Sequence, residues 1–100
     1  MNTETRRFFA EKDFKPPPGM TKMAVRMRAK RSLGPYTLLL ESSCGTGPPR
    51  VAGSARLFLF DTRSDDADEP VAIKRFAVDS WREATSELMR AVDVLRGKEK

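Results

Sequence analysis

Apolar and polar residues alternate over residues 22–30, which predicts a strand with one buried and one exposed face. The apolar positions are Met23, Val25, Met27 and Ala29, and the polar positions are Lys22, Arg26, Arg28 and Lys30. Turn-forming residues at 32–35 precede a second, more apolar strand at residues 36–42. These two strands are expected to pair as a hairpin whose first strand has a basic outer face.

Two further strands are predicted in the second half of the chain, at residues 55–62 and 71–77. In the first of them the two faces differ in chemistry, with Leu57 and Leu59 on one side and Arg56, Phe58 and Phe60 on the other. A Gly- and Pro-rich stretch at residues 43–54 predicts a long loop before this strand, and an acidic stretch at residues 61–70 predicts a second loop after it.

The strand at residues 71–77 leads into the one long amphipathic pattern in the sequence. Ser80 is a preferred N-cap residue, and Glu83 three positions later completes a capping box that predicts the start of a helix. Gly97 is placed to end it. The apolar stripe consists of Trp81, Ala84, Leu88, Ala91 and Leu95, widened by Met89 and Val92. We expect Trp81, Leu88 and Leu95 to face the core or a dimer interface.

The element order predicts an α+β fold: a four-stranded antiparallel sheet followed by one C-terminal amphipathic helix packed on one face. Residues 22–97 form this single domain, and residues 98–100 are a short tail. Residues 1–21 are expected to form a flexible, basic and Pro-rich arm, because three consecutive prolines prevent regular structure. Three interpretations of its start stay open: a disordered tail, a turn of helix at residues 6–9, or a short linear element that binds a protein partner through Arg6, Arg7, Phe8 and Phe9.

Composition argues against several classes of function. The chain has no His and a single Cys, Cys44, so it lacks the usual nucleophile–base pairs and any intramolecular disulfide. We predict neither an enzyme nor a metal or cofactor site, and the Asp residues of the acidic loop are expected to be solvated. No apolar run reaches the roughly 18 residues of a membrane span. An intracellular location, in the cytoplasm, nucleoid or nucleus, is expected, without membrane contact.

Charge is distributed unevenly along the chain. The sequence has 19 Lys and Arg against 14 Asp and Glu, and the excess of positive charge lies in residues 1–60. A basic surface of this kind attracts polyanions, or serves solubility alone. If Leu57 and Leu59 lie under the helix, alternation places the cations and the aromatic rings together on the opposite face. The candidate nucleic-acid-binding residues are Arg26, Arg28, Lys30, Arg56, Phe58 and Phe60, with Tyr36 as a third ring if the second strand presents it on that side.

The opposite arrangement is also open: Phe58 and Phe60 in the core, with Leu57 and Leu59 covered by the arm or by a second subunit. The three leucines Leu38, Leu39 and Leu40 carry more apolar surface than one helix covers. A homodimer is therefore expected.

Residues 74–83, KRFAVDSWRE, follow basic strands and resemble the C-terminal strand-to-helix unit of the single-stranded-DNA-binding transcriptional coactivators of the positive-cofactor-four type. In that family an apolar residue ends the last strand and a Trp follows five positions later, as Phe76 and Trp81 do here. The chain is also similar to the Pur-alpha family. The resemblance covers residues 71–95 in detail and implies a dimer with helices at its interface and single-stranded nucleic acid on the sheet. The loops at 43–54 and 61–70 depart from it.

Two hypotheses follow for function. In the first, the protein binds single-stranded DNA or RNA through the basic and aromatic sheet face, in transcription or in DNA or RNA metabolism, and its affinity falls steeply with salt. In the second, it is a small subunit or inhibitor that binds a protein partner through residues 1–19 and exposed apolar surface.

Overall fold

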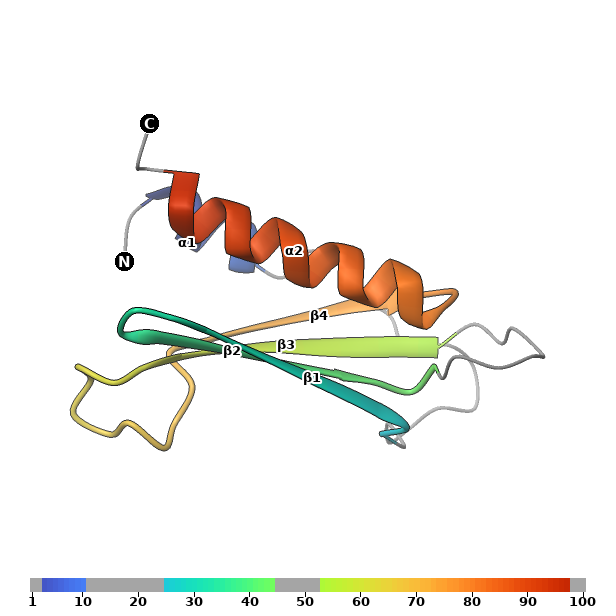
Figure 1. Ribbon diagram of the computed structural model, residues 1–100, viewed down its shortest axis with the longest axis horizontal. Helices are drawn as coiled ribbons and strands as arrows, with labels where there is room; N and C mark the ends of the chain where they lie inside the picture. The colour runs from blue at the N-terminus through green and yellow to red at the C-terminus, as the bar shows by residue number, and fades with distance from the viewer. Residues whose placement is uncertain (1–2, 11–24, 45–52, 98–100) are drawn as a thin grey trace.

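The computed structural model describes residues 3–10, 25–44 and 53–97, which form a four-stranded antiparallel sheet with two helices on one face (Figure 1). The strands follow one another across the sheet in chain order. They are β1 (Met27–Leu33), β2 (Tyr36–Ser42), β3 (Gly53–Asp61) and β4 (Ala72–Val78). The helices are α1 (Thr3–Phe9) and α2 (Trp81–Gly97). The predicted α+β class, with a C-terminal helix on the sheet, is confirmed.

The first hairpin differs from the prediction in where its strand ends. We expected a turn over residues 32–35, but β1 continues to Leu33, which pairs with Tyr36. The turn needs only Gly34 and Pro35 because Gly34 has a φ of 58°, and Gly at the first central position of a two-residue hairpin turn is typical of type II′. Residues 22–24, where the predicted strand began, lie outside the described residues.

Gly34 provides a test of this turn that does not depend on packing. A Cβ added at Gly34 would meet nothing within 4 Å, so Gly34→Ala changes only the backbone preference. We expect Gly34→Ala to lower the free energy of unfolding by about 1 kcal/mol, because a positive φ is unfavourable for a residue with a Cβ. Urea unfolding measures this, and Gly34→Asn is the matched control. An Ala variant no less stable than the Asn variant would contradict the assignment of a left-handed residue here.

The core lies between the sheet and α2. Leu38 and Leu40 of β2 pair with Leu59 and Leu57 of β3, and all four side chains have no exposed surface. The buried residues of α2 are Ala84, Leu88, Ala91, Val92 and Leu95. The stripe predicted from the 3- and 4-residue spacing therefore faces the sheet, as expected for an amphipathic helix. Two of its members depart: Trp81 is half-buried at the edge of the core, and Met89 is 46% exposed.

The start of α2 carries the predicted capping residues. Ser80 Oγ accepts a hydrogen bond from the Glu83 amide at 3.2 Å, which satisfies one of the amides left unpaired in the first turn. Glu83 Oε1 in turn accepts from the Asp79 amide at 3.1 Å, one residue earlier than in the usual capping box. Together these two bonds determine where β4 ends and α2 begins. Gly97, expected just beyond the helix, is the last residue of α2.

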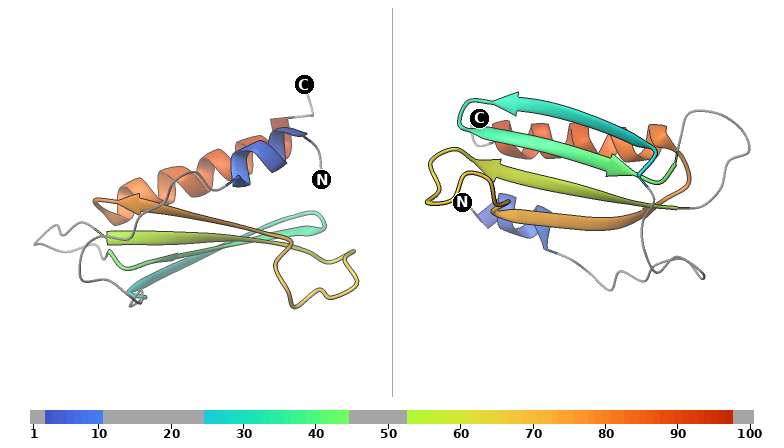
Figure 2. Two further views of the ribbon diagram at one scale, coloured as in Figure 1. Left: turned by 180° about the vertical axis from the view of Figure 1, so that it is seen from behind. Right: turned by 90° about the horizontal axis from the view of Figure 1, so that it is seen from below.

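Residues 3–9 form a helix, so the expected flexible arm is wrong for this segment, and the turn of helix left open for residues 6–9 is part of this longer helix. α1 lies beside α2 on the same side of the sheet (Figures 1 and 2). Phe9 is only 5% exposed and belongs to the core, with Phe8 packed against it edge to face. Burial of this apolar surface within the chain explains the order of such a short helix. The rest of the expected arm, residues 1–2 and 11–21, lies outside the described residues.

A charged residue on the inner side of β4 explains how α1 is held. Lys74 pairs with Leu57, so it lies on the helix side of the sheet. Its ammonium group donates a hydrogen bond to Glu87 of α2 and lies 3.8 Å from the centre of the Phe8 ring. Both side chains of the ion pair are at least 80% buried, so removal of Glu87 would leave a largely buried ammonium group without its carboxylate. We infer that this contact joins α1, α2 and β4.

Candidate nucleic-acid interface

The sheet face away from the helices is formed by alternate residues of all four strands, and no described segment lies across it (Figure 2, right). The strand register arranges these side chains in rows that cross the sheet. The first row is Arg28, Glu41, Arg56 and Arg75. The second is Lys30, Leu39, Phe58 and Ile73, and the third is Ser32, Thr37 and Phe60. We call these three rows the open face.

The open face brings together most of the residues expected to share it. Arg28, Lys30, Arg56, Phe58 and Phe60 come from β1 and β3, which are not adjacent, and the register of β2 between them places all five on one side. The alternative arrangement, with the two rings in the core, is wrong. The reason is that Leu57 and Leu59, which alternate with these rings along β3, already fill the space on the helix side of the sheet and have no exposed surface.

The two rings of β3 form a partly accessible aromatic surface. Phe58 and Phe60 are half-buried, with ring centres 6.4 Å apart and planes inclined by 29°. The guanidinium carbon of Arg56 lies 5.6 Å from the centre of the Phe58 ring, within the range of a cation–π contact. A positive charge therefore lies next to a flat π surface, which is the pairing of groups that stacks a base while attracting its phosphate.

Tyr36, predicted as a third ring of the site, lies on the other face of the sheet. It pairs with Leu33 and Asp61 on the same side as the buried leucines of β2 and packs against the core, so it does not belong to the open face. The second-strand residues that do belong to it are the intervening ones, Thr37, Leu39 and Glu41. Arg26, the first predicted cation, is exposed just before β1, where its amide donates to the Ser42 carbonyl at 2.8 Å.

Glu41 is the main feature of the open face that the sequence analysis missed. Its carboxylate accepts a hydrogen bond from Arg28 Nε at 3.1 Å and another from Arg56 Nη2 at 2.7 Å. The three side chains lie in one row because Glu41 pairs with both arginines across neighbouring strands. The alternation of residues 36–42 puts Glu41 on the side opposite Leu38 and Leu40. It assigns Glu41 to the open face only once these two leucines are known to face the helices. Leu39, Ile73 and Arg75 were missed for the same reason.

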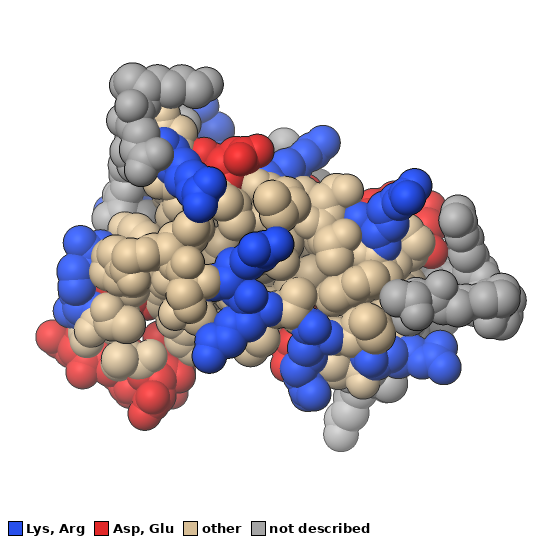
Figure 3. All heavy atoms as spheres, viewed as in Figure 1, with Lys and Arg blue, Asp and Glu red and all other residues tan. Residues whose placement is uncertain are grey.

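The acidic loop lies at the far end of the open face from the arginine row. Asp61 comes five positions after Arg56 in β3, which corresponds to about 17 Å along a strand. Figure 3 shows the largest group of acidic side chains at the end where the β3–β4 loop lies, with basic side chains spread over the region of β1 and β2. Phosphate bound at the first row is therefore distant from the acidic residues, whose repulsion at this range is largely screened by salt.

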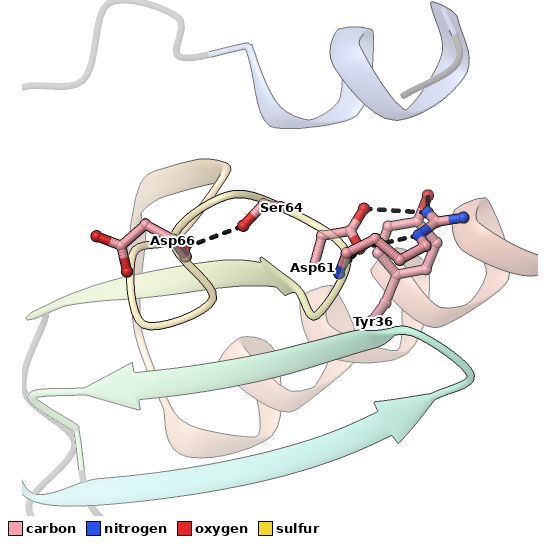
Figure 4. A network of polar contacts seen from close by, with 5 residues as sticks. Tyr36, Asp61, Ser64 and Asp66 are labelled. Carbon is pink, nitrogen blue, oxygen red and sulfur yellow. Dashed lines mark hydrogen bonds and ion pairs between the residues drawn. The ribbon is translucent and has the colours of Figure 1, made fainter.

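Part of the acidic loop is neutralised internally (Figure 4). Asp61 accepts hydrogen bonds from the backbone amide, Nε and Nη2 of Arg63, at 2.9 to 3.0 Å. These bonds lower the pKa of Asp61 and, with a bond to Tyr36, raise that of Arg63. Arg63 Nη2 also donates to the Tyr36 hydroxyl at 3.1 Å, and its guanidinium lies over the Tyr36 ring. Ser64 and Asp68 bond to Asp66 within the loop.

The other candidate groups form no site in the described part of the chain. Cys44 is buried, with its thiol 3.8 Å from the Val78 carbonyl oxygen. Within residues 3–10, 25–44 and 53–97, no three His, Cys, Asp or Glu side chains come together as metal ligands. Neither helix of the described structure is long and apolar enough to cross a bilayer.

Comparison with known proteins supplies no assignment. No family model matches the chain, and searches of curated proteins and of solved structures each find no match.

Proposed function

We propose that the protein binds single-stranded DNA or RNA on the open face of its sheet. The observation that carries this proposal is the register that gathers Arg28, Lys30 and Arg56 with Phe58 and Phe60 on the side that the helices leave uncovered. Counting Arg75, four cations and one carboxylate lie within the three rows of this face. The resemblance of residues 74–83 to single-strand-binding coactivators points to the same class of ligand.

The chemistry of the rows suggests how a strand is bound. Arginine guanidinium groups in the first row attract phosphates, and the rings of the second and third rows offer faces on which unpaired bases stack. Bases within a duplex are stacked on one another and present only their edges, so they cannot use these rings. We therefore expect single strands to be preferred over duplex, with little dependence on base sequence.

The direct test is a titration of the protein against a labelled single-stranded oligonucleotide and the matching duplex, each at about 50 and 200 mM salt. We expect tighter binding of the single strand and a steep loss of its affinity at the higher salt, because bound phosphates release counterions. The absence of salt-dependent binding at the lower salt would refute the proposal. A salt-independent complex with a protein partner would instead support the interaction-factor hypothesis.

Arg28 is the cation whose removal should report phosphate contact most simply. Its side chain is 64% exposed and lies in the first row, so Arg28→Ala should not disturb the core. We expect weaker binding to single strands of any sequence and a salt slope reduced by about one phosphate contact. Arg82→Ala, on the exposed side of α2, is the control for the change in net charge. Equal losses in the two variants would show that Arg28 makes no local contact.

The second hypothesis finds less support in the described residues. Phe9, expected to bind a partner, is buried in the protein's own core, and Phe8 packs against Lys74. Of that predicted set only Arg6 and Arg7 are exposed. The homodimer stays a prediction, although Leu38 and Leu40 are covered within one chain and only Leu39 of the three leucines lies on the open face. An intracellular location and a role in transcription stay proposals as well.

A further inference from the structure

We propose that Glu41 is an internal competitor for phosphate: its carboxylate occupies Arg28 and Arg56 in the free protein and must release them when a strand binds. This inference rests on the proposed function of the open face and concerns the affinity of the same site. Glu41 would then limit how strongly the open face binds polyanions. Because phosphate contacts alone would bind weakly, affinity would depend more on the stacking of unpaired bases.

The geometry of the three side chains carries the first step. Both carboxylate oxygens are used, Oε2 by Arg28 Nε at 3.1 Å and Oε1 by Arg56 Nη2 at 2.7 Å. A carboxylate held by two guanidinium groups has the charge and the acceptor geometry of a bound phosphate. Because the three residues are cross-strand neighbours, this anion lies at the middle of the row that the proposed function assigns to phosphates.

The exposure of the three groups shows which of them can be reached from solvent. The Arg28 side chain is 64% exposed and that of Arg56 is 37% exposed, whereas Glu41 is 13% exposed. Phosphate can therefore approach the guanidinium groups from outside, while the carboxylate lies beneath them. Because Glu41 is itself largely buried, its release from both arginines would leave a poorly solvated carboxylate without these partners, and this penalty is what limits the affinity of the open face for phosphate.

Arg56 provides an independent observation. Its Nε is buried and finds no hydrogen-bond acceptor among the described residues. Buried donors in native proteins are usually paired, and an unpaired one is unfavourable. The position that Arg56 adopts to reach Glu41 thus leaves one of its donors unsatisfied. A phosphate that draws the guanidinium outward would allow that donor to be solvated or paired, which favours the exchange.

The test compares wild type, E41Q and D93N in binding to a labelled oligothymidine of about 15 nucleotides. E41Q keeps the size of the side chain and removes its charge, and D93N makes the same change in net charge on the exposed side of α2, behind the sheet. We expect E41Q to bind about five- to tenfold more tightly at about 50 mM salt, with a salt slope steeper by about 0.7, because the open face then carries one more net positive charge against the phosphates. D93N should bind as wild type does.

A double-mutant cycle separates competition from a general field effect. If Glu41 acts by occupying Arg28, E41Q should increase affinity less in an R28A background than in wild type. The logarithm of the affinity gain should be less than about half of its value in wild type, because one of the two released guanidinium groups is then absent. A full gain in that background would overturn the pairing mechanism. A thermal melt confirms folding of each variant, and E41T, which retains strand propensity, replaces E41Q if the latter is unfolded at the assay temperature.

The outcomes distinguish this inference from the proposed function. Binding by wild type that E41Q leaves unchanged or weakens overturns the inference and leaves the proposed function intact. A gain in D93N equal to that in E41Q also overturns it. Failure of both wild type and E41Q to bind the strand at low salt overturns the proposed function and the inference together. Tighter binding by E41Q alone supports both.

Discussion

Leu57→Ala is expected to lower the free energy of unfolding by about 2–5 kcal/mol, the largest effect we anticipate for any single change in this protein. Leu57 is completely buried between β2 and β4, in the same core cluster as the buried residues of α2. Removal of three carbon atoms there loses their transfer free energy and leaves a cavity that a packed sheet cannot close. For a domain of this size the melting temperature should fall by roughly 10–20 °C or more.

Urea unfolding and calorimetry measure this loss, and Leu57→Met is the matched control. The Met variant retains nearly the same volume and should be destabilised by less than about 1.5 kcal/mol. If Leu57→Ala were as stable as wild type, the assignment of this face of β3 to the core would be contradicted. The result would then favour the opposite arrangement of the strand, in which the neighbouring phenylalanines fill the core.

Phe58→Ala is expected to weaken binding of single strands by about 1–3 kcal/mol, or about 5- to 150-fold, while leaving the salt slope almost unchanged. Phe58 is adjacent to Leu57 in the chain but lies on the open face, at the centre of its second row. Loss of the ring removes a stacking surface and no charge. Its effect on the free energy of unfolding should be about 1 kcal/mol or less, typical of a half-buried cross-strand contact.

The controls for Phe58→Ala separate stacking from general apolar contact. Phe58→Tyr retains the flat ring and should bind as wild type does, whereas Phe58→Leu retains apolar surface without a π face and should resemble the Ala variant. A thermal melt measured before any oligonucleotide is added compares Phe58→Ala with Leu57→Ala directly. Unfolding of the Phe58 variant, or full retention of binding by it, would remove the stacking surface from the proposed function.

The local pattern of the sequence was sufficient to predict the four strands and the long C-terminal helix, although not all of their ends. β2 occupies residues 36–42 as expected, and α2 begins after the capping residues Ser80 and Glu83. Alternation with a period of two in strands and spacing of three and four in the helix are properties of neighbouring residues, so they can be recognised without the fold. The same patterns placed Leu57 and Leu59 opposite Phe58 and Phe60.

Only the tertiary structure decided which residues that are distant in the chain come into contact. Alternation divides β2 into two sets but does not say which is covered, and burial of Leu38 and Leu40 under α2 placed Tyr36 inside and Glu41 outside. The ion pairs of Glu41 join residues 13 and 15 positions apart and exist only in this register. Likewise, α1 is ordered because Phe9 finds apolar surface on elements formed by the other end of the chain. A seven-residue helix has too few hydrogen bonds to be stable alone, so its local sequence left a turn of helix as only one of several possibilities.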